Sequence, residues 1–172
     1  MIPTLTTDRL VLRPLRPEDF EGYAALMASD RARYMGGPYA WDAAWGLFCH
    51  EVGCWALFGA GGLGIEAEGR LVGQVGINQG PLFPEPEIGW QLYDGAEGKG
   101  YATEAARALR DWAFGTGRFA TLVSYVHPDN AASARVAERL GGVPDADAPR
   151  QPGAGNEADL VYRYDPPSED SR

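Results

Sequence analysis

A turn that contains the chain's single lysine is the first candidate for chemistry. Lys99 lies between Gly98 and Gly100, and a run of strong helix formers begins at Tyr101. Glycines let the backbone turn so that successive N–H groups point the same way, and the first turn of a helix adds unpaired N–H groups and the positive end of its dipole. Such a nest binds an anion, most naturally a phosphate, and Lys99 would add mobile positive charge at its rim.

The common phosphate-binding motifs do not match this turn. The P-loop requires GxxxxGK[ST], but Lys99 is followed by glycine. The dinucleotide fingerprint GxGxxG would place its third small residue at Thr103, and no acid follows at the expected place. The glycine loop of protein kinases lies between two strands, whereas a helix is predicted here. The local pattern therefore leaves two interpretations open: an anion-binding turn, or an ordinary turn with a helix cap.

Other reactive groups predict no metal site. The spacing of Cys49 and Cys54 fits neither a CxxC redox pair nor a zinc knuckle. His50 lies beside Cys49, but no second pair of ligands is present to complete a metal shell. His127 ends an apolar strand just before a proline, and we interpret it as structural.

The composition is that of one acidic globular domain. The chain has 172 residues, 45% of them apolar, and a formal net charge of −9. Its arginines are scattered rather than clustered, so we expect no nucleic-acid partner. We expect no membrane span and no secretory signal. Two cysteines make no disulfide framework, so we expect the reducing cytoplasm as the location. The predicted domain covers residues 1–165, a flexible tail covers 166–172, and the oligomeric state stays open.

Hydrophobic periodicity predicts an α/β (α+β) fold. Three consecutive strands indicate an antiparallel part, and strand–helix–strand over 87–126 indicates a right-handed crossover that joins a parallel pair. We therefore expect one mixed sheet with helices on both faces. Asp129 or Asn130 would cap the last helix, and Gly141 would end it. Strands are expected within 9–15, 61–80, 86–95, 119–126 and 158–165, helices within 16–30, 41–58, 101–114 and 127–142, and loops over 31–41 and 142–157.

The helix predicted over 41–58 carries large apolar residues at helical spacing. We interpret this stripe as a buried face, because most such stripes belong to the core. A second interpretation is that some members also wall a substrate pocket. The stripe consists of Trp41, Trp45, Phe48, Val52 and Trp55.

Three stretches, in order along the chain, resemble one known family. EIGWQLYDGAEGKGYATEAARALRDWAF resembles the acetyl-CoA-binding segment of the GNAT N-acetyltransferase superfamily, written [QR]xxGx[GA], with Gly100 and Ala102 as its last two anchors. TDRLVLRPLRPEDF and HPDNAASARVAERLGG resemble segments of the RimJ/RimL-like branch, the ribosomal-protein-alanine acetyltransferases. Two features depart from the family pattern. Glu97 replaces the usual Gln or Arg, and residues 143–157 lack the usual strand.

The resemblance implies the GNAT fold, a mostly antiparallel sheet in which two parallel strands splay apart to receive acetyl-CoA. The turn would hold the diphosphate. The pantetheine arm would pair with the first splayed strand, and a main-chain N–H near Leu92 would stabilise the oxyanion. The cofactor-binding residues expected on this basis are Trp90, Gln91, Leu92, Glu97, Gly98, Lys99, Gly100, Tyr101, Ala102, Thr103, Asn130 and Ser133.

The resemblance also implies direct attack on the thioester by a primary amine, either a protein N-terminus or a small amine. Glu87 is the candidate base, with a solvated strand end or an attraction for a cationic acceptor as alternatives. Ser133 is the candidate proton donor to the leaving sulfur, with first-turn capping as its alternative. An acyl-CoA-binding module without turnover and a nucleotide-binding protein stay open. Residues that could frame a cationic acceptor are Tyr34, Trp41, Trp45, Glu85 and Glu87.

Overall fold

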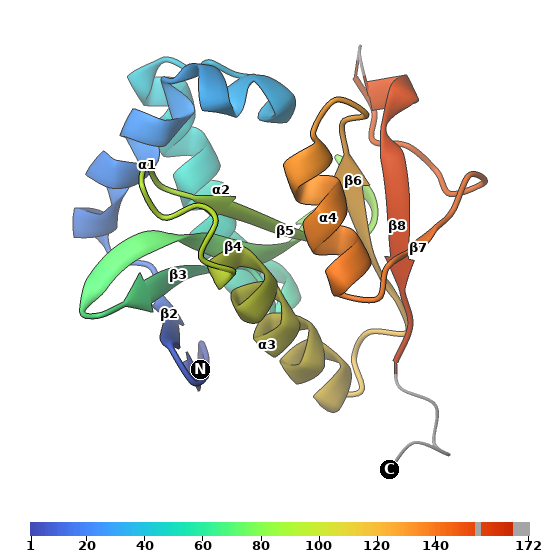
Figure 1. Ribbon diagram of the computed structural model, residues 1–172, viewed down its shortest axis with the longest axis horizontal. Helices are drawn as coiled ribbons and strands as arrows, with labels where there is room; N and C mark the ends of the chain where they lie inside the picture. Colours follow the sequence, from blue (N-terminus) through green and yellow to red (C-terminus); the bar gives the residue numbers. More distant parts are fainter. Residues whose placement is uncertain (154–155, 167–172) are drawn as a thin grey trace.

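The computed structural model describes residues 1–153 and 156–166. Their strands form an eight-stranded sheet in the order β1-β2-β3-β4-β5-β6-β8-β7 (Figure 1). Within the described residues β5 and β6 are parallel and the other neighbouring pairs are antiparallel, which confirms the predicted mixed sheet. The strands are β1 (Leu5–Thr6), β2 (Leu10–Pro14), β3 (Gly62–Ala67), β4 (Arg70–Gly80), β5 (Phe83–Leu92), β6 (Leu122–Val126), β7 (Val143–Pro144) and β8 (Leu160–Tyr164).

Helices cover both faces of the sheet. Helix α2 contacts β3 and β4 and supports α1, whereas α3 contacts β4 and β5 from the opposite face and packs beside α4 (Figure 1). No helix among the described residues is long and apolar enough to cross a bilayer. The helical segments are η1 (Pro17–Asp19), α1 (Phe20–Met27), η2 (Asp30–Met35), α2 (Trp41–Phe58), α3 (Tyr101–Gly115), α4 (Ala131–Arg139) and η3 (Asn156–Ala158).

The two faces of the sheet differ in chemistry because side chains alternate along each strand. The face under α3 is apolar. It contains Ile65, Val75 and Ile77, which pack with Leu109 in the main core cluster. The face under α1 and α2 instead carries glycine and polar residues such as Gln74, which alternates with Val75. This second face is therefore the side on which polar chemistry can take place.

Helix α4 ends as the sequence predicts. Gly141 adopts the left-handed φ of 81°. Its N–H donates to the Glu138 carbonyl and the N–H of Gly142 donates to the Ala137 carbonyl, each at 2.9 Å. These two bonds satisfy carbonyls that the helix leaves unpaired. At the other end Asn130, rather than Asp129, is the N-cap.

The prediction that the aromatic stripe of α2 is buried is wrong in part. Phe48 is buried, but Trp41 and Trp45 keep 63% and 45% of their surface exposed, and Val52 is exposed as well. Both indole rings meet Phe20 edge-on, at 4.7 and 4.8 Å between centroids. Helix α2 is apolar on most sides, so the spacing of large residues did not identify the face that α1 and the sheet cover.

Two predicted loops contain short elements. Residues 31–41 include most of η2, a 3₁₀ helix. The predicted loop over 142–157 includes β7, which pairs with β8, and the start of η3. Two residues are too few for alternating hydrophobicity to indicate a strand. Of the predicted tail, residues 167–172 lie outside the described residues.

Candidate acetyl-transfer site

Strands β5 and β6 meet at one point and then part. Glu87 pairs with Val123, and the Ser124 hydroxyl donates to the Ile88 carbonyl at 2.6 Å. The described residues contain no further pair between these strands. The main chain of β5 beyond Ile88 therefore borders a gap on its β6 side.

The alternation of the β-ladder decides which main-chain groups face this gap. The Tyr93 N–H donates to the Val72 carbonyl of β4 at 2.8 Å, so the main-chain groups of Tyr93 and Gln91 are directed to β4. Those of Trp90 and Leu92 are directed to the gap. Gln91 instead uses its side-chain amide, which donates to Gln74 at 3.2 Å on the polar face of the sheet.

The glycine turn ends the gap and begins α3. Gly98 and Gly100 have φ angles of 76° and 81°, which glycine adopts without strain. Gly100 is the N-cap residue, and no side chain caps the helix. The first-turn N–H groups from Tyr101 to Thr103 are consequently free of a side-chain acceptor, as an anion-binding nest requires. Ala102 is buried, and the Lys99 ammonium lies 5.9 Å from the centre of the Tyr101 ring.

Arginines secure both sides of this turn. Arg31 of η2 forms an ion pair with Glu97 and donates to the Leu92 carbonyl at 2.8 Å. Arg9 donates to the Lys99 carbonyl at 2.9 Å. The carboxylate of Glu97 is therefore neutralised by Arg31, a residue that sequence analysis did not single out. The acid at Glu97, unusual for the resembled motif, was the available signal that a cation is nearby.

The corner between β6 and α4 lies across the gap from β5 and contacts η2. The Asn130 side chain accepts a hydrogen bond from the Ser133 N–H at 3.1 Å, whereas the Ser133 hydroxyl has no hydrogen-bond partner among the described residues. His127 packs against Tyr34 of η2 with 4.9 Å between ring centroids, and the Tyr34 hydroxyl donates to the Asp129 carbonyl. Segment η2 thus contacts both sides of the gap.

Two acidic residues lie on the polar face near the point where the strands part. The Asn78 amide donates to the half-buried Glu87 carboxylate at 3.3 Å, and burial raises the pKa of Glu87 to about 7. Burial, followed by the charge of Glu87, likewise raises the pKa of Glu51 of α2 to about 7. Sequence analysis missed Glu51, although it is an acid in a helix that is otherwise largely apolar.

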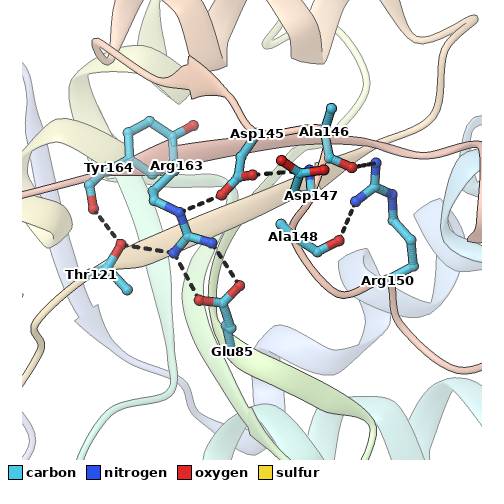
Figure 2. A network of polar contacts seen from close by, with 9 residues as sticks. All are labelled: Glu85, Thr121, Asp145, Ala146, Asp147, Ala148, Arg150, Arg163 and Tyr164. Carbon is cyan, nitrogen blue, oxygen red and sulfur yellow. Dashed lines mark hydrogen bonds and ion pairs between the residues drawn. The ribbon is translucent and has the colours of Figure 1, made fainter.

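Glu85 is committed to a structural network. Arg163 of β8 binds both of its carboxylate oxygens, at 2.7 and 2.9 Å, as Figure 2 shows. The same guanidinium donates to Asp145 at 2.7 Å and to Thr121 at 3.2 Å. The expectation that Glu85 helps to frame a cationic acceptor is not supported by this geometry. Its position fixes β5 against β6 and β8 at the closed end of the gap.

Comparisons with known proteins agree with this geometry. Residues 9–143 match the model of the acetyltransferase (GNAT) domain. The crystal structure of an acetyltransferase from Agrobacterium tumefaciens is 56% identical, covers 95% of each chain and superposes with a TM-score of 0.90. The ribosomal L7/L12 alpha-N-protein acetyltransferase RimL, solved with coenzyme A, is 18% identical over 95% of this chain and 98% of its own, with a TM-score of 0.76. YkkB of Bacillus subtilis is 39% identical over 75 residues, which span 42% of this chain and 44% of YkkB.

Proposed function

Since this chain belongs to the acetyltransferase (GNAT) family, we propose that it transfers an acetyl group from acetyl-CoA to a primary amine. One observation carries this proposal: the main chain of Trp90 and Leu92, which faces the gap without a strand partner, leads directly to the uncapped glycine turn at the start of α3. An extended arm that ends in a diphosphate fits this sequence of donors. The structures of RimL with coenzyme A and of the microcin C7 self immunity acetyltransferase MccE with acetyl-CoA and AMP support the same ligand.

In this proposal the cosubstrate binds to main-chain groups. Trp90 supplies its N–H and C=O groups to the amides of the arm, in the manner of an added strand. Leu92 supplies only its N–H, because its carbonyl already accepts a hydrogen bond from Arg31. The N–H groups from Gly98 to Thr103 receive the diphosphate, and Lys99 adds charge at the rim. A main-chain N–H of β5 near the thioester oxygen stabilises the developing negative charge.

The acceptor approaches from the polar face of the sheet. Glu87 takes a proton from the entering ammonium, because only a neutral amine can attack the thioester carbon. The unpartnered Ser133 hydroxyl supplies a hydrogen bond or proton to the leaving sulfur, while Asn130 fixes the corner of β6 and α4. The proposed acceptors are protein N-termini and small amines. The protein N-termini are included because we also propose that the chain belongs to the RimJ/RimL-like branch.

The decisive experiment follows thiol release from acetyl-CoA. The protein is incubated with peptides bearing free N-termini and with small primary amines, and N-acetylated peptides of the same sequence are the controls. Release with free amines alone supports the proposal. Binding of acetyl-CoA without release for any amine would favour the acyl-CoA-binding module, and binding of ATP or NAD in place of coenzyme A would overturn both.

A further inference from the structure

Three glycines in register form a smooth floor on the polar face of the sheet. Gly62 of β3 pairs with Gly76 of β4, which in turn pairs with Gly89 of β5. A Cβ atom placed on Gly62 or Gly76 would lie only 2.6 or 2.7 Å from the carboxylate oxygen Oε2 of Glu51. A side chain at either position would therefore displace the Glu51 carboxylate of α2, which rests directly on both glycines.

Above the third glycine, Gly89, there is open space. A Cβ atom on Gly89 would meet nothing nearer than the Asn78 amide nitrogen, at 4.0 Å. Glu87 lies two residues before Gly89 on β5 and so points to the same face. The open space above Gly89 thus has Glu51 at one end and Glu87 at the other.

Two acceptor groups around this space, the Asn78 side-chain oxygen and the Glu51 carboxylate, lack a hydrogen-bond donor among the described residues. The Asn78 oxygen Oδ1 is buried without a hydrogen-bond partner among the described residues, while its amide nitrogen donates to Glu87. A buried acceptor oxygen in this state requires a donor from elsewhere. Glu51 itself has no hydrogen bond or ion pair with a described residue.

The charged and titratable groups near the two carboxyls do not neutralise them. Glu51 is faced by Tyr23 of α1, by Cys54 of its own helix, and by Tyr93. Glu87 is faced by Tyr125 of β6 and Tyr164 of β8, and by Asp159, which raises the pKa of Glu87 further. Arg163, the arginine next to Tyr125, is held by Glu85 and Asp145.

We infer that Glu51 is the second acidic residue of the acceptor site and that it binds the acceptor's ammonium above Gly89 together with Glu87. This inference rests on the proposed function. A cation in the open space would supply the missing donors to Asn78 and compensate both carboxylates, and a protein with a net charge of −9 attracts such acceptors.

The proton balance of the reaction suits two carboxyl groups. Each acetylation forms one C–N bond and breaks one C–S bond, and the nitrogen goes from an ammonium with three protons to an amide with one. Glu87 takes the first proton and passes it to solvent, and the second goes to the leaving sulfur. Glu51 stays ionised and holds the ammonium, while Glu87 exchanges its proton with solvent.

The test replaces Glu51 with Gln and follows the carboxyl carbons of Glu51 and Glu87 by NMR between pH 4 and 9. Loss of the neighbouring charge should lower the pKa of Glu87 by roughly one unit. The KM for the amine should rise about tenfold or more, with an unchanged KM for acetyl-CoA. Asp42→Asn, an equal loss of charge at an exposed position of α2, should change none of these values.

A second variant fills the open space without strain. Gly89→Ala should raise the KM for the amine while it leaves the fold and the KM for acetyl-CoA unchanged, because its Cβ atom meets no close neighbour. An unaltered amine KM in both variants overturns the inference. Wild-type protein that releases no thiol overturns the proposed function instead. In that case the NMR titration alone tests whether Glu51 and Glu87 interact. An unchanged pKa of Glu87 in Glu51→Gln would contradict that interaction.

Discussion

At the scale of a single residue, Glu87 should make the activity depend on pH. A base must be ionised to accept a proton, and burial raises the pKa of this carboxyl to about 7. We therefore expect kcat/KM to fall as the pH drops below about 7. Glu87→Gln should remove this limb and lower kcat by about 10²- to 10⁴-fold, measured as thiol release between pH 5.5 and 9. An unchanged profile would remove Glu87 from the role of base.

The stability of the same variant provides the control. The folded protein binds this proton more tightly than the unfolded chain does, because the pKa rises from 4.5 to about 7 on folding. The contribution of Glu87 to the free energy of unfolding is therefore greatest at low pH and is lost as the pH rises through this window. At pH 8 Glu87→Gln should be at least as stable as the wild type in urea, so lost activity cannot be attributed to unfolding.

Arg31 and Glu97 form a pair whose role a double-mutant cycle can measure. Arg31→Gln leaves the Glu97 carboxylate without its ion-pair partner beside the proposed diphosphate site. We expect acetyl-CoA affinity to fall about tenfold, since an uncompensated charge next to an anion is repulsive. Adding Glu97→Gln should restore most of this loss in calorimetric titrations. A double variant as weak as Arg31→Gln would show that Arg31 acts on the ligand directly.

The proposed role of the Ser133 hydroxyl can be tested separately from the part that the Ser133 main chain plays in the helix cap. The cap uses the Ser133 main-chain N–H and the Asn130 side chain, so Ser133→Ala preserves it. We expect kcat to fall by about 10- to 100-fold, with unchanged acetyl-CoA binding, because the sulfur loses a hydrogen-bond donor. Asn130→Ala should instead lower the free energy of unfolding by about 1 kcal/mol. Full activity of Ser133→Ala would assign the hydroxyl no part in the reaction.

At the scale of elements, the turn that begins α3 depends on the backbone of Gly100. A Val at this position would be strained at φ 81°, and its side chain would crowd the nest and Arg9. Gly100→Val should abolish measurable acetyl-CoA binding at millimolar concentration. Gly95→Val is the matched control, because Gly95 has a similar φ of 77° in the same loop but no neighbour within 4 Å. Equal binding by both variants would contradict the nest.

At the scale of the whole molecule, Arg163 joins four strands or their ends. It connects Glu85 of β5, Thr121 before β6, and Asp145 after β7 to its own strand β8 (Figure 2). Arg163→Met should lower the free energy of unfolding, because it leaves the carboxylates of Glu85 and Asp145 without their ion-pair partner. Adding Glu85→Gln should recover part of this loss in urea denaturation. No recovery would indicate that Asp145 dominates the network.

The sequence by itself determined the elements and the turn that joins them. Alternation, helical spacing and caps depend on residues near one another in the chain, so the sheet strands, α3 and the stop at Gly141 could be predicted. The resemblance to a known family then indicated how β5 and β6 part. Short elements such as β7, and the exposed side of the uniformly apolar α2, gave no periodic signal.

Only the tertiary structure decided which charges meet. Arg31 reaches Glu97, Arg163 takes Glu85 out of the acceptor side, and Glu51 rests on glycines of two strands. Each contact joins residues far apart in the chain, and the pKa of a carboxyl depends on its burial and on these neighbours rather than on its own sequence context. The turn that begins α3 was therefore readable from local pattern, whereas the acidic residues near the gap had to be located in space.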